Sequence, residues 1–115
     1  MRFDKKKYLA CTVDDLKKTR SYGIEIRING VSKQYFLIYR DKQVYSYLNR
    51  CPHTGVSLDW VPHQFLDSSN SYIQCATHGA LFAIENGKCL RGPCVGDQLE
   101  IIENSNIEGN IYLII

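Results

Sequence analysis

The chain has 115 residues, of which 44% are hydrophobic, and a formal net charge of +2. This length suits one domain, residues 1–115, and the composition is that of a folded globular protein rather than a disordered one. Basic residues near the start are followed by no apolar run, which argues against a signal peptide, a membrane span and a membrane partner, and favours the cytoplasm.

Charge is divided unevenly along the chain. Residues 1–50 hold twelve Lys or Arg against five acids, whereas residues 51–115 hold two against seven. A basic half can bind nucleic acid, but here the cations are scattered through strand-like segments without an aromatic-basic RNA motif. We therefore expect a solvated surface and no nucleic-acid partner.

The first half of the chain predicts strands joined by tight turns. Alternation with period two and aromatic or β-branched residues mark the strands, and Asn29-Gly30 is a strong hairpin signal. The polar stretch from Asp14 to Thr19 predicts a turn or a short helix. The expected strands are residues 7–13, 24–28, 34–40 and 43–48, the last two being joined across a turn at Asp41-Lys42.

The second half predicts shorter strands and almost no helix. A polar hairpin turn is expected from Glu85 to Lys88. The pattern as a whole predicts an all-β fold, a small antiparallel sandwich or barrel. The expected strands here are residues 71–74, 80–84, 98–103 and 111–115.

Two short motifs each combine one cysteine with one histidine. The first is Cys51-Pro-His53-Thr-Gly and the second is Cys75-Ala-Thr-His78-Gly. Structural zinc sites usually take their ligands as a Cys-Cys pair and a His-His pair, so that each pair wraps one ion. A mixed pair in each motif suits two adjacent metals, with both thiolates on one and both imidazoles on the other.

Taken together, these motifs closely resemble the C-x-H…C-x-x-H signature of Rieske [2Fe–2S] domains. The likeness continues to Gly92-Pro93-Cys94, which resembles the proline loop that covers the cluster in that family. The resemblance implies one [2Fe–2S] cluster per chain, with Cys51 and Cys75 on one iron and His53 and His78 on the other. It also implies an inserted cluster-binding subdomain at about residues 50–95.

The resemblance further implies a reduction potential at the low end of the family. High-potential members carry a Ser and a Tyr where this chain has Ala80 and Phe82, so both hydroxyl donors to the cluster sulfurs are absent. Those members also join their two ligand loops by a disulfide whose cysteines would fall at Val56 and Thr77. Without that bond, the chain resembles the ferredoxins and reductase subunits that serve bacterial oxygenases.

Three further cysteines and one histidine are expected to be structural. Cys11 lies in a predicted strand and is interpreted as a small buried hydrophobe. Cys89 and Cys94 flank the proline turn, and we expect two reduced, packed thiols, with a disulfide or a redox-sensing pair as alternatives. His63 is expected in a loop, without a role as a ligand.

The resemblance implies a Rieske-type ferredoxin that carries single electrons from a flavin reductase to an oxygenase and has no catalytic site of its own. A terminal oxygenase needs a further iron held by two His and a carboxylate, and only His63 remains. One alternative is the small subunit of a larger reductase resembling assimilatory nitrite reductase, with the large subunit as partner. A zinc-stabilised interaction module is the other.

Overall fold

The computed structural model describes residues 5–52, 55, 57–59, 63–76 and 79–115. Within them the chain forms nine strands and one short helix, and no helix has the length and apolar character to cross a bilayer. The elements are β1 (Lys7–Thr12), α1 (Val13–Thr19), β2 (Ser21–Ile28), β3 (Val31–Arg40), β4 (Gln43–Leu48), β5 (Ile73–Gln74), β6 (Leu81–Phe82), β7 (Cys89–Arg91), β8 (Glu103–Ile107) and β9 (Asn110–Ile114).

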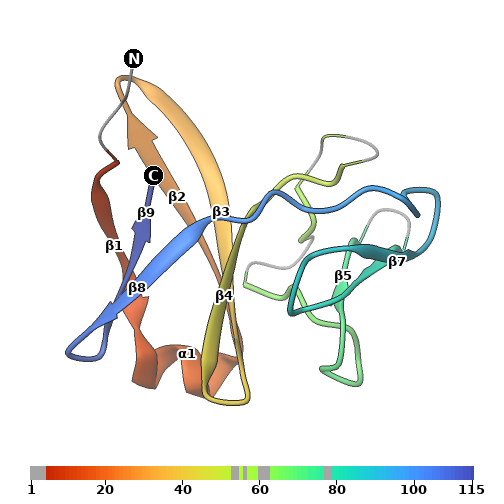
Figure 1. The fold of residues 1–115 in the computed structure, drawn as a ribbon, viewed down its shortest axis with the longest axis horizontal. Coiled ribbons are helices and arrows are strands. Elements are labelled where there is room, and N and C mark those ends of the chain that lie inside the picture. Colours follow the sequence, from red (N-terminus) through yellow and green to blue (C-terminus); the bar gives the residue numbers. More distant parts are fainter. Residues whose placement is uncertain (1–4, 53–54, 56, 60–62, 77–78) are drawn as a thin grey trace.

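The strands make three antiparallel sheets of three strands each, with the orders β1-β9-β8, β2-β3-β4 and β5-β6-β7. The first two sheets and α1 lie together on one side of the molecule, and the short third sheet lies with the long loops on the other (Figure 1). The all-β prediction is confirmed. Below, the first group is called the base and residues 49–99 the loop segment.

Strand β3 is buried on both faces in its central part. Because side chains alternate along a strand, Tyr35 and Leu37 face the core of the base, whereas Phe36 and Ile38 face the core of the loop segment. All four are at most 2% exposed. This double burial explains why the sequence here is a continuous apolar run and not an alternation.

The two predicted hairpin turns of the base are confirmed. Asn29 (φ 53°) and Gly30 join β2 to β3, and Asp41 (φ 51°) and Lys42 (φ 65°) join β3 to β4. Both central residues of each turn have positive φ, the geometry that matches the twist of the flanking strands. In the second turn that geometry is reached without a glycine.

The expected strand at residues 98–103 is wrong, because β8 begins only at Glu103. Leu99 is buried in the core of the loop segment and Ile102 in the core of the base, so this stretch crosses from one core to the other. It meets β4 through separate hydrogen bonds, including Leu48 N–H to Glu100 O (3.0 Å) and Ile102 N–H to Ser46 O (2.9 Å). A crossing chain cannot keep a continuous ladder.

The stretch predicted as a turn or a short helix forms the helix α1, and both of its ends are capped. Thr12 precedes it, and its side-chain oxygen accepts a hydrogen bond from the backbone N–H of Asp15 (3.2 Å). Arg20 ends it in the left-handed region (φ 68°). One buried side chain, Leu16, fixes the helix to the core of the base.

Tyr47 fastens β4 to the turn after β6, and this contact can be tested. Its ring is 1% exposed and its hydroxyl donates to the carbonyl oxygen of Ile84. Replacing Tyr47 by Phe leaves that buried carbonyl without this donor, and we expect the free energy of unfolding to fall by about 1–2 kcal/mol. Denaturant unfolding of matched preparations measures the change.

Tyr45→Phe is the matched control, because the Tyr45 hydroxyl donates to Gln43 at an exposed site. Its effect should stay within about 0.5 kcal/mol. Burial, with smaller contributions from the charges of Glu85 and Tyr45, raises the pKa of Tyr47. Stability should therefore fall above about pH 10, where unfolded tyrosine ionises, and less so in Tyr47→Phe. Equal stability losses in the two variants would contradict this account of the contact.

Candidate functional site

The two Cys-and-His motifs fold into matching turns. The backbone N–H of Gly55 donates to the carbonyl oxygen of Cys51 (2.8 Å), and that of Gly79 donates to Cys75 O (2.9 Å). Both glycines have positive φ, 76° and 65°, a conformation that a residue with a Cβ rarely adopts. Each motif is therefore closed by one hydrogen bond between its first and fifth residues, and the fifth is a glycine with positive φ.

Both cysteines are buried in the same apolar core. Cys51 is 1% exposed and Cys75 is not exposed, and the two share the core of the loop segment with Phe36 and Phe82. Cys51 comes three residues after the end of β4 and Cys75 follows β5 directly, so each is positioned by a strand. The remaining expected ligands, His53 and His78, lie outside the described residues, as do Val56, Trp60 and Thr77.

A backbone hydrogen bond joins the two turns. The N–H of Ala76, directly after Cys75, donates to the carbonyl oxygen of Leu58 (2.8 Å), and Leu58 has no exposed surface. On its other side, the N–H of Leu58 donates to the side-chain oxygen of Asn49 (2.8 Å). Asn49 lies two residues before Cys51, so one continuous set of hydrogen bonds links the surroundings of both cysteines.

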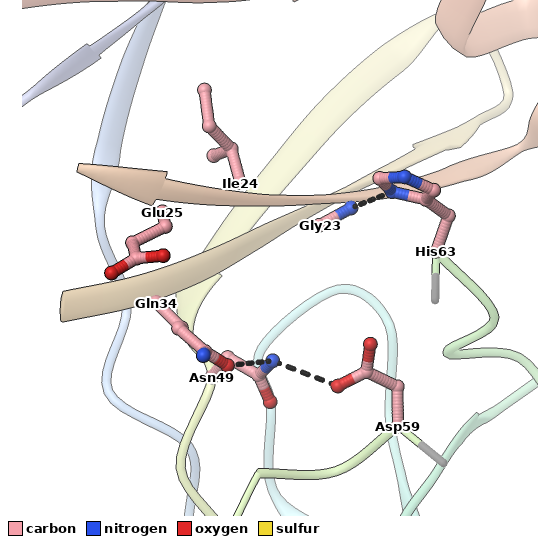
Figure 2. Close-up of a pocket in the computed structure, with 7 residues that line it drawn as sticks. All are labelled: Gly23, Ile24, Glu25, Gln34, Asn49, Asp59 and His63. Atoms are coloured by element: carbon pink, nitrogen blue, oxygen red, sulfur yellow. Dashed lines mark hydrogen bonds between the residues drawn. The ribbon is translucent and has the colours of Figure 1, made fainter. Parts of the chain in front are cut away.

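Asn49 is the centre of a polar network that closes the first turn (Figure 2). Its side-chain nitrogen donates to Asp59 Oδ1 (3.0 Å) and lies 3.5 Å from Gln34 Oε1. Ser57 also donates to Gln34 Oε1 (3.0 Å). Asn49 is 8% exposed, and these hydrogen bonds satisfy both the oxygen and the nitrogen of its side-chain amide. Sequence reasoning missed Asn49, whose only signal is its place two residues before the motif.

The stretch between the two motifs is anchored to the base rather than merely bridging them. His63, which has positive φ (67°), stacks on Tyr22 with ring centroids 4.6 Å apart. Its Nδ1 accepts a hydrogen bond from the N–H of Gly23 (3.0 Å), and its carbonyl oxygen accepts one from the Ser21 hydroxyl (2.5 Å). His63 is thus a loop residue, as expected, whose ring is engaged with β2.

Phe65 completes this anchor from inside the core. It has no exposed surface and stacks on Phe36 of β3, with ring centroids 4.4 Å apart. Its carbonyl oxygen accepts from the N–H of Gln74 (2.9 Å), the residue before Cys75. The ring of Phe65 therefore connects the double-faced strand β3 to the approach of the second motif.

A polar turn follows Phe65 and is fixed to the end of β3. Arg40 donates to the carbonyl oxygen of Ser71 (3.0 Å). Within the turn, desolvation raises the pKa of the Asp67 carboxyl, but hydrogen bonds from the Ser69 hydroxyl and from backbone N–H groups together outweigh it and leave the pKa lowered. The carboxylate thus acts as an acceptor that holds the turn closed.

The cavity in Figure 2 has a volume of 170 Å³ and lies between β2 and the first turn. Neither Cys51 nor Cys75 lines it. Its walls carry two carboxylates, two amides and the His63 ring, most of them in the hydrogen bonds just described. The cavity is therefore a by-product of the way the loop segment joins the base. Its lining residues are Gly23, Ile24, Glu25, Gln34, Asn49, Asp59 and His63.

Ala80 and Phe82 place apolar groups just after the second motif. Ala80 is 1% exposed and Phe82 has no exposed surface. The carbonyl oxygen of Ala80 accepts from the N–H of Cys75 (2.9 Å), which closes the second turn from its far side. Neither side chain offers a hydroxyl to the sulfurs nearby, as the sequence indicates.

The expectation of two reduced thiols at Cys89 and Cys94 is wrong, because they form a disulfide. Cys89 begins β7 and Cys94 follows the Gly92-Pro93 turn, which brings their Cα atoms to 5.9 Å, within the usual bonding range. Cys11 lies in β1 as expected but is half-buried instead of buried. Burial and the neighbouring Asp15 charge raise the pKa of its thiol to about 11, so it is a poor nucleophile at neutral pH.

The two turns place two cysteine sulfurs in a buried, apolar environment, where they could bind a soft metal. Apolar side chains surround Cys51 and Cys75, and backbone hydrogen bonds fix both turns independently of any ligand. Such a site favours a thiolate-bound metal centre, because thiolates select iron–sulfur clusters, zinc or copper. No proton-transfer constellation is needed for that role.

Comparisons with known proteins narrow the choice of metal centre. The family model of the Rieske [2Fe-2S] domain matches residues 6–104. A comparison with curated protein sequences found no match.

Solved structures of small ferredoxins share this fold along nearly the whole chain. The ferredoxin of carbazole 1,9a-dioxygenase from Nocardioides aromaticivorans IC177 superposes with a TM-score of 0.70 at 20% identity, covering 93% of this chain and 95% of that one. The Sphingomonas yanoikuyae B1 ferredoxin gives 0.69 at 18% identity, with 96% and 99% covered.

A larger protein also contains this fold. The terminal oxygenase of carbazole 1,9a-dioxygenase from Novosphingobium sp. KA1 superposes with a TM-score of 0.72 at 22% identity. The match covers 98% of this chain but only 30% of the oxygenase. These identities establish a shared fold, and the length of the chain is that of the small ferredoxins.

Asn49 gives a test of how the first turn is held. Asn49→Ala removes the acceptor of the Leu58 N–H, and we expect the free energy of unfolding to fall by about 1–3 kcal/mol. The loosened turn should also make the exposed Arg50 a faster site of trypsin cleavage. Denaturant unfolding and the rate of cleavage after Arg50 are the two measurements.

Asn104→Ala is the matched control, because that side chain donates to Val44 O (3.2 Å) and Ser46 Oγ (2.8 Å) within the base. It should lower stability without a selective rise in cleavage after Arg50. If the two variants speed that cleavage equally, Asn49 has no special hold on the first turn.

Proposed function

The chain belongs to the Rieske [2Fe–2S] domain family and binds a [2Fe–2S] cluster, and we propose that it carries single electrons between redox proteins. We further propose Cys51 and Cys75 as ligands of one iron and His53 and His78 as ligands of the other. The observation that carries the proposal is the pair of matching glycine-closed turns that bring Cys51 and Cys75 into one buried core. Two cysteines and two histidines are the donor set that this cluster type requires.

The residues of the chain fit this cofactor in their chemistry. When bound, the cluster accepts and releases one electron. Cys51 and Cys75 supply sulfur donors in a site with almost no exposed surface, and apolar neighbours such as Phe82 keep water away from them. The backbone hydrogen bond between Ala76 and Leu58 holds the two ligand turns together, and fixed ligands reduce the rearrangement that electron transfer requires.

We propose an oxygenase as electron acceptor and a flavin reductase as donor. The support is that the chain aligns nearly end to end with small ferredoxins, one of them described in a complex of reduced oxygenase and oxidised ferredoxin. In this proposal residues 1–115 form one domain, with residues of about 50–95 acting as the cluster-binding subdomain. The cytoplasm is the proposed compartment for this carrier and its reductase and oxygenase partners.

Purification of the native protein separates the carrier from its alternatives. A carrier elutes alone and is coloured, whereas the small subunit of a reductase elutes with a large catalytic chain. A zinc-stabilised module would be colourless. Visible absorption together with size-exclusion chromatography therefore distinguishes the three functions in one preparation, and a colourless protein with stoichiometric zinc would refute cluster binding.

Single substitutions test the proposed ligands. Replacing Cys51, His53, Cys75 or His78 by Ala should abolish cluster assembly, because each iron needs all four of its coordination positions filled. The visible spectrum and the iron content of each purified variant provide the measurement.

His63→Ala is the control, since that ring is hydrogen-bonded to Gly23 and stacked on Tyr22. It should retain the cluster spectrum, although the loss of its anchor is expected to lower stability. A colourless His63→Ala beside a coloured His53→Ala would show that the ligands have been assigned wrongly.

The absence of hydroxyl donors predicts a low potential. Hydrogen bonds to cluster sulfurs stabilise the reduced state, and Ala80 and Phe82 cannot provide them. The midpoint potential should be on the order of −150 mV rather than +300 mV. Phe82→Tyr should raise it if the new hydroxyl reaches a sulfur. Protein-film voltammetry measures both proteins, and a wild-type midpoint well above zero would contradict the argument.

A further inference from the structure

The Cys89–Cys94 disulfide closes a six-residue loop on the surface of the loop segment. Its sulfur-bearing residues are buried, with Cys94 unexposed and Cys89 6% exposed, whereas Leu90 between them is 52% exposed. The loop is paired with β6 through Phe82 opposite Cys89 and Leu81 opposite Arg91. The disulfide therefore ties an exposed turn to the strand that follows the second ligand turn.

Gly92, at the tip of this loop, lies directly on Ala80. A Cβ built on Gly92 would lie 3.0 Å from the Cβ of Ala80 and 3.1 Å from its Cα, tighter than nine in ten real Cβ contacts, so Ala80 or the loop would have to shift by a few tenths of an ångström. Ala80 in turn accepts a hydrogen bond from the N–H of Cys75 (2.9 Å). One path of direct contacts therefore runs from the disulfide loop through Ala80 to a proposed cluster ligand.

We propose that Cys89–Cys94 is a redox modification site, reduced by a dithiol, whose closed form holds the Gly92 loop on the second ligand turn and prolongs the life of the cluster. The proposal rests on the proposed function for its second half only. High-potential members of the family join their two ligand loops by a disulfide, and this chain has Val56 and Thr77 in place of those cysteines. In this proposal the Cys89–Cys94 disulfide serves instead, although it closes a single loop and does not join two.

Reduction is a balanced exchange with the dithiol. A thiolate of the reagent attacks the sulfur of Cys89, which is the less buried residue of the two, and Cys94 leaves as a thiolate. The second reagent thiol then displaces Cys89 and forms the reagent's own disulfide. Two electrons and two protons end on Cys89 and Cys94 as thiols, and the bond between them is broken.

In the reduced form the Cys89 thiol has a hydrogen-bond acceptor nearby, but the two sulfur atoms are too close for a non-bonded contact. Cys89 Sγ lies 3.5 Å from the carbonyl oxygen of Arg91, to which a free thiol can donate. However, non-bonded heavy atoms need roughly 3.5 Å, whereas a disulfide holds its sulfurs at about 2.05 Å. The sulfurs must separate inside a packed core, and the exposed loop around Gly92 is the side that can yield.

Thiol counting tests the modification without reference to the cluster. The chain has five cysteines, two of them in the disulfide. After acid quenching and denaturation, N-ethylmaleimide should label three cysteines in air-equilibrated protein and five after dithiothreitol treatment. Five labels before any reductant would overturn the proposal.

Cluster lifetime tests the consequence. We expect dithiothreitol to speed the loss of visible absorbance of wild-type holoprotein in mild denaturant on the order of tenfold. Cys89→Ser/Cys94→Ser should lose colour at that faster rate with or without the dithiol, whereas Cys11→Ser should behave as wild type. Equal rates for the oxidised wild type and the double variant would refute the role of the disulfide. A wild type that never acquires colour would instead refute the proposed function.

A glycine pair tests the contact itself with the disulfide intact, which also covers a double variant that fails to fold. Gly92→Ala pushes the loop off Ala80, while Gly96→Ala has a similar φ (104° against 109°) but meets nothing within 4 Å. Gly92→Ala should speed cluster loss well beyond Gly96→Ala. If the two lose colour at the same rate, the loop does not act through Ala80.

Discussion

The fold depends on burying both faces of β3 at once. Tyr35 and Leu37 on one face complete the core of the base, and Phe36 and Ile38 on the other begin the core of the loop segment. In its described residues the segment contributes short strands of two or three residues, which could not form a stable sheet alone. Its order comes from packing on a strand that the base already holds. The stack of Phe36 on Phe65 is one direct contact between the two cores.

At the candidate site, hydrogen bonds hold the two turns in place, whereas apolar packing holds the rest of the loop segment on β3. Backbone groups link Cys51 to Gly55, Cys75 to Gly79 and Leu58 to Ala76, while Asn49 ties the first turn back to the end of β4. In a core with little water, each of these bonds is costly to leave unmade, so the two turns hold their shape together. Such a frame is suited to a one-electron carrier, whose ligands should move little between oxidation states.

The features of the fold that could be predicted from the sequence are those that depend on local sequence patterns. Hairpins at Asn29-Gly30 and Asp41-Lys42, strand alternation and the two Cys-and-His motifs depend on neighbours along the chain, and β2, β3 and β4 with their turns formed as expected. The predicted strands at 71–74 and 80–84 are shorter than expected, as β5 and β6 have two residues each, and β7 was not predicted. What was missed depends on contacts distant in sequence. Neither the role of Asn49, nor the docking of His63 on β2, nor the Cys89–Cys94 bond follows from local preference. The wrongly predicted strand at 98–103 also reflects contacts that are distant in sequence, since Leu99 packs in the core of the loop segment and Ile102 in the core of the base.

The cluster and the disulfide undergo different redox reactions, although Cys89 and Cys94 share one core with Cys51 and Cys75. The cluster exchanges one electron, whereas opening the disulfide requires two, so a single turnover of the carrier cannot open it. A cluster at about −150 mV is also too weak a reductant for ordinary protein dithiol couples, which lie near −180 to −270 mV. Electron flow to the proposed oxygenase acceptor should therefore leave the Cys89–Cys94 bond untouched. Its state follows the dithiol pool of the compartment, and in the proposed cytoplasmic compartment that pool would decide how firmly the Gly92 loop covers the second ligand turn.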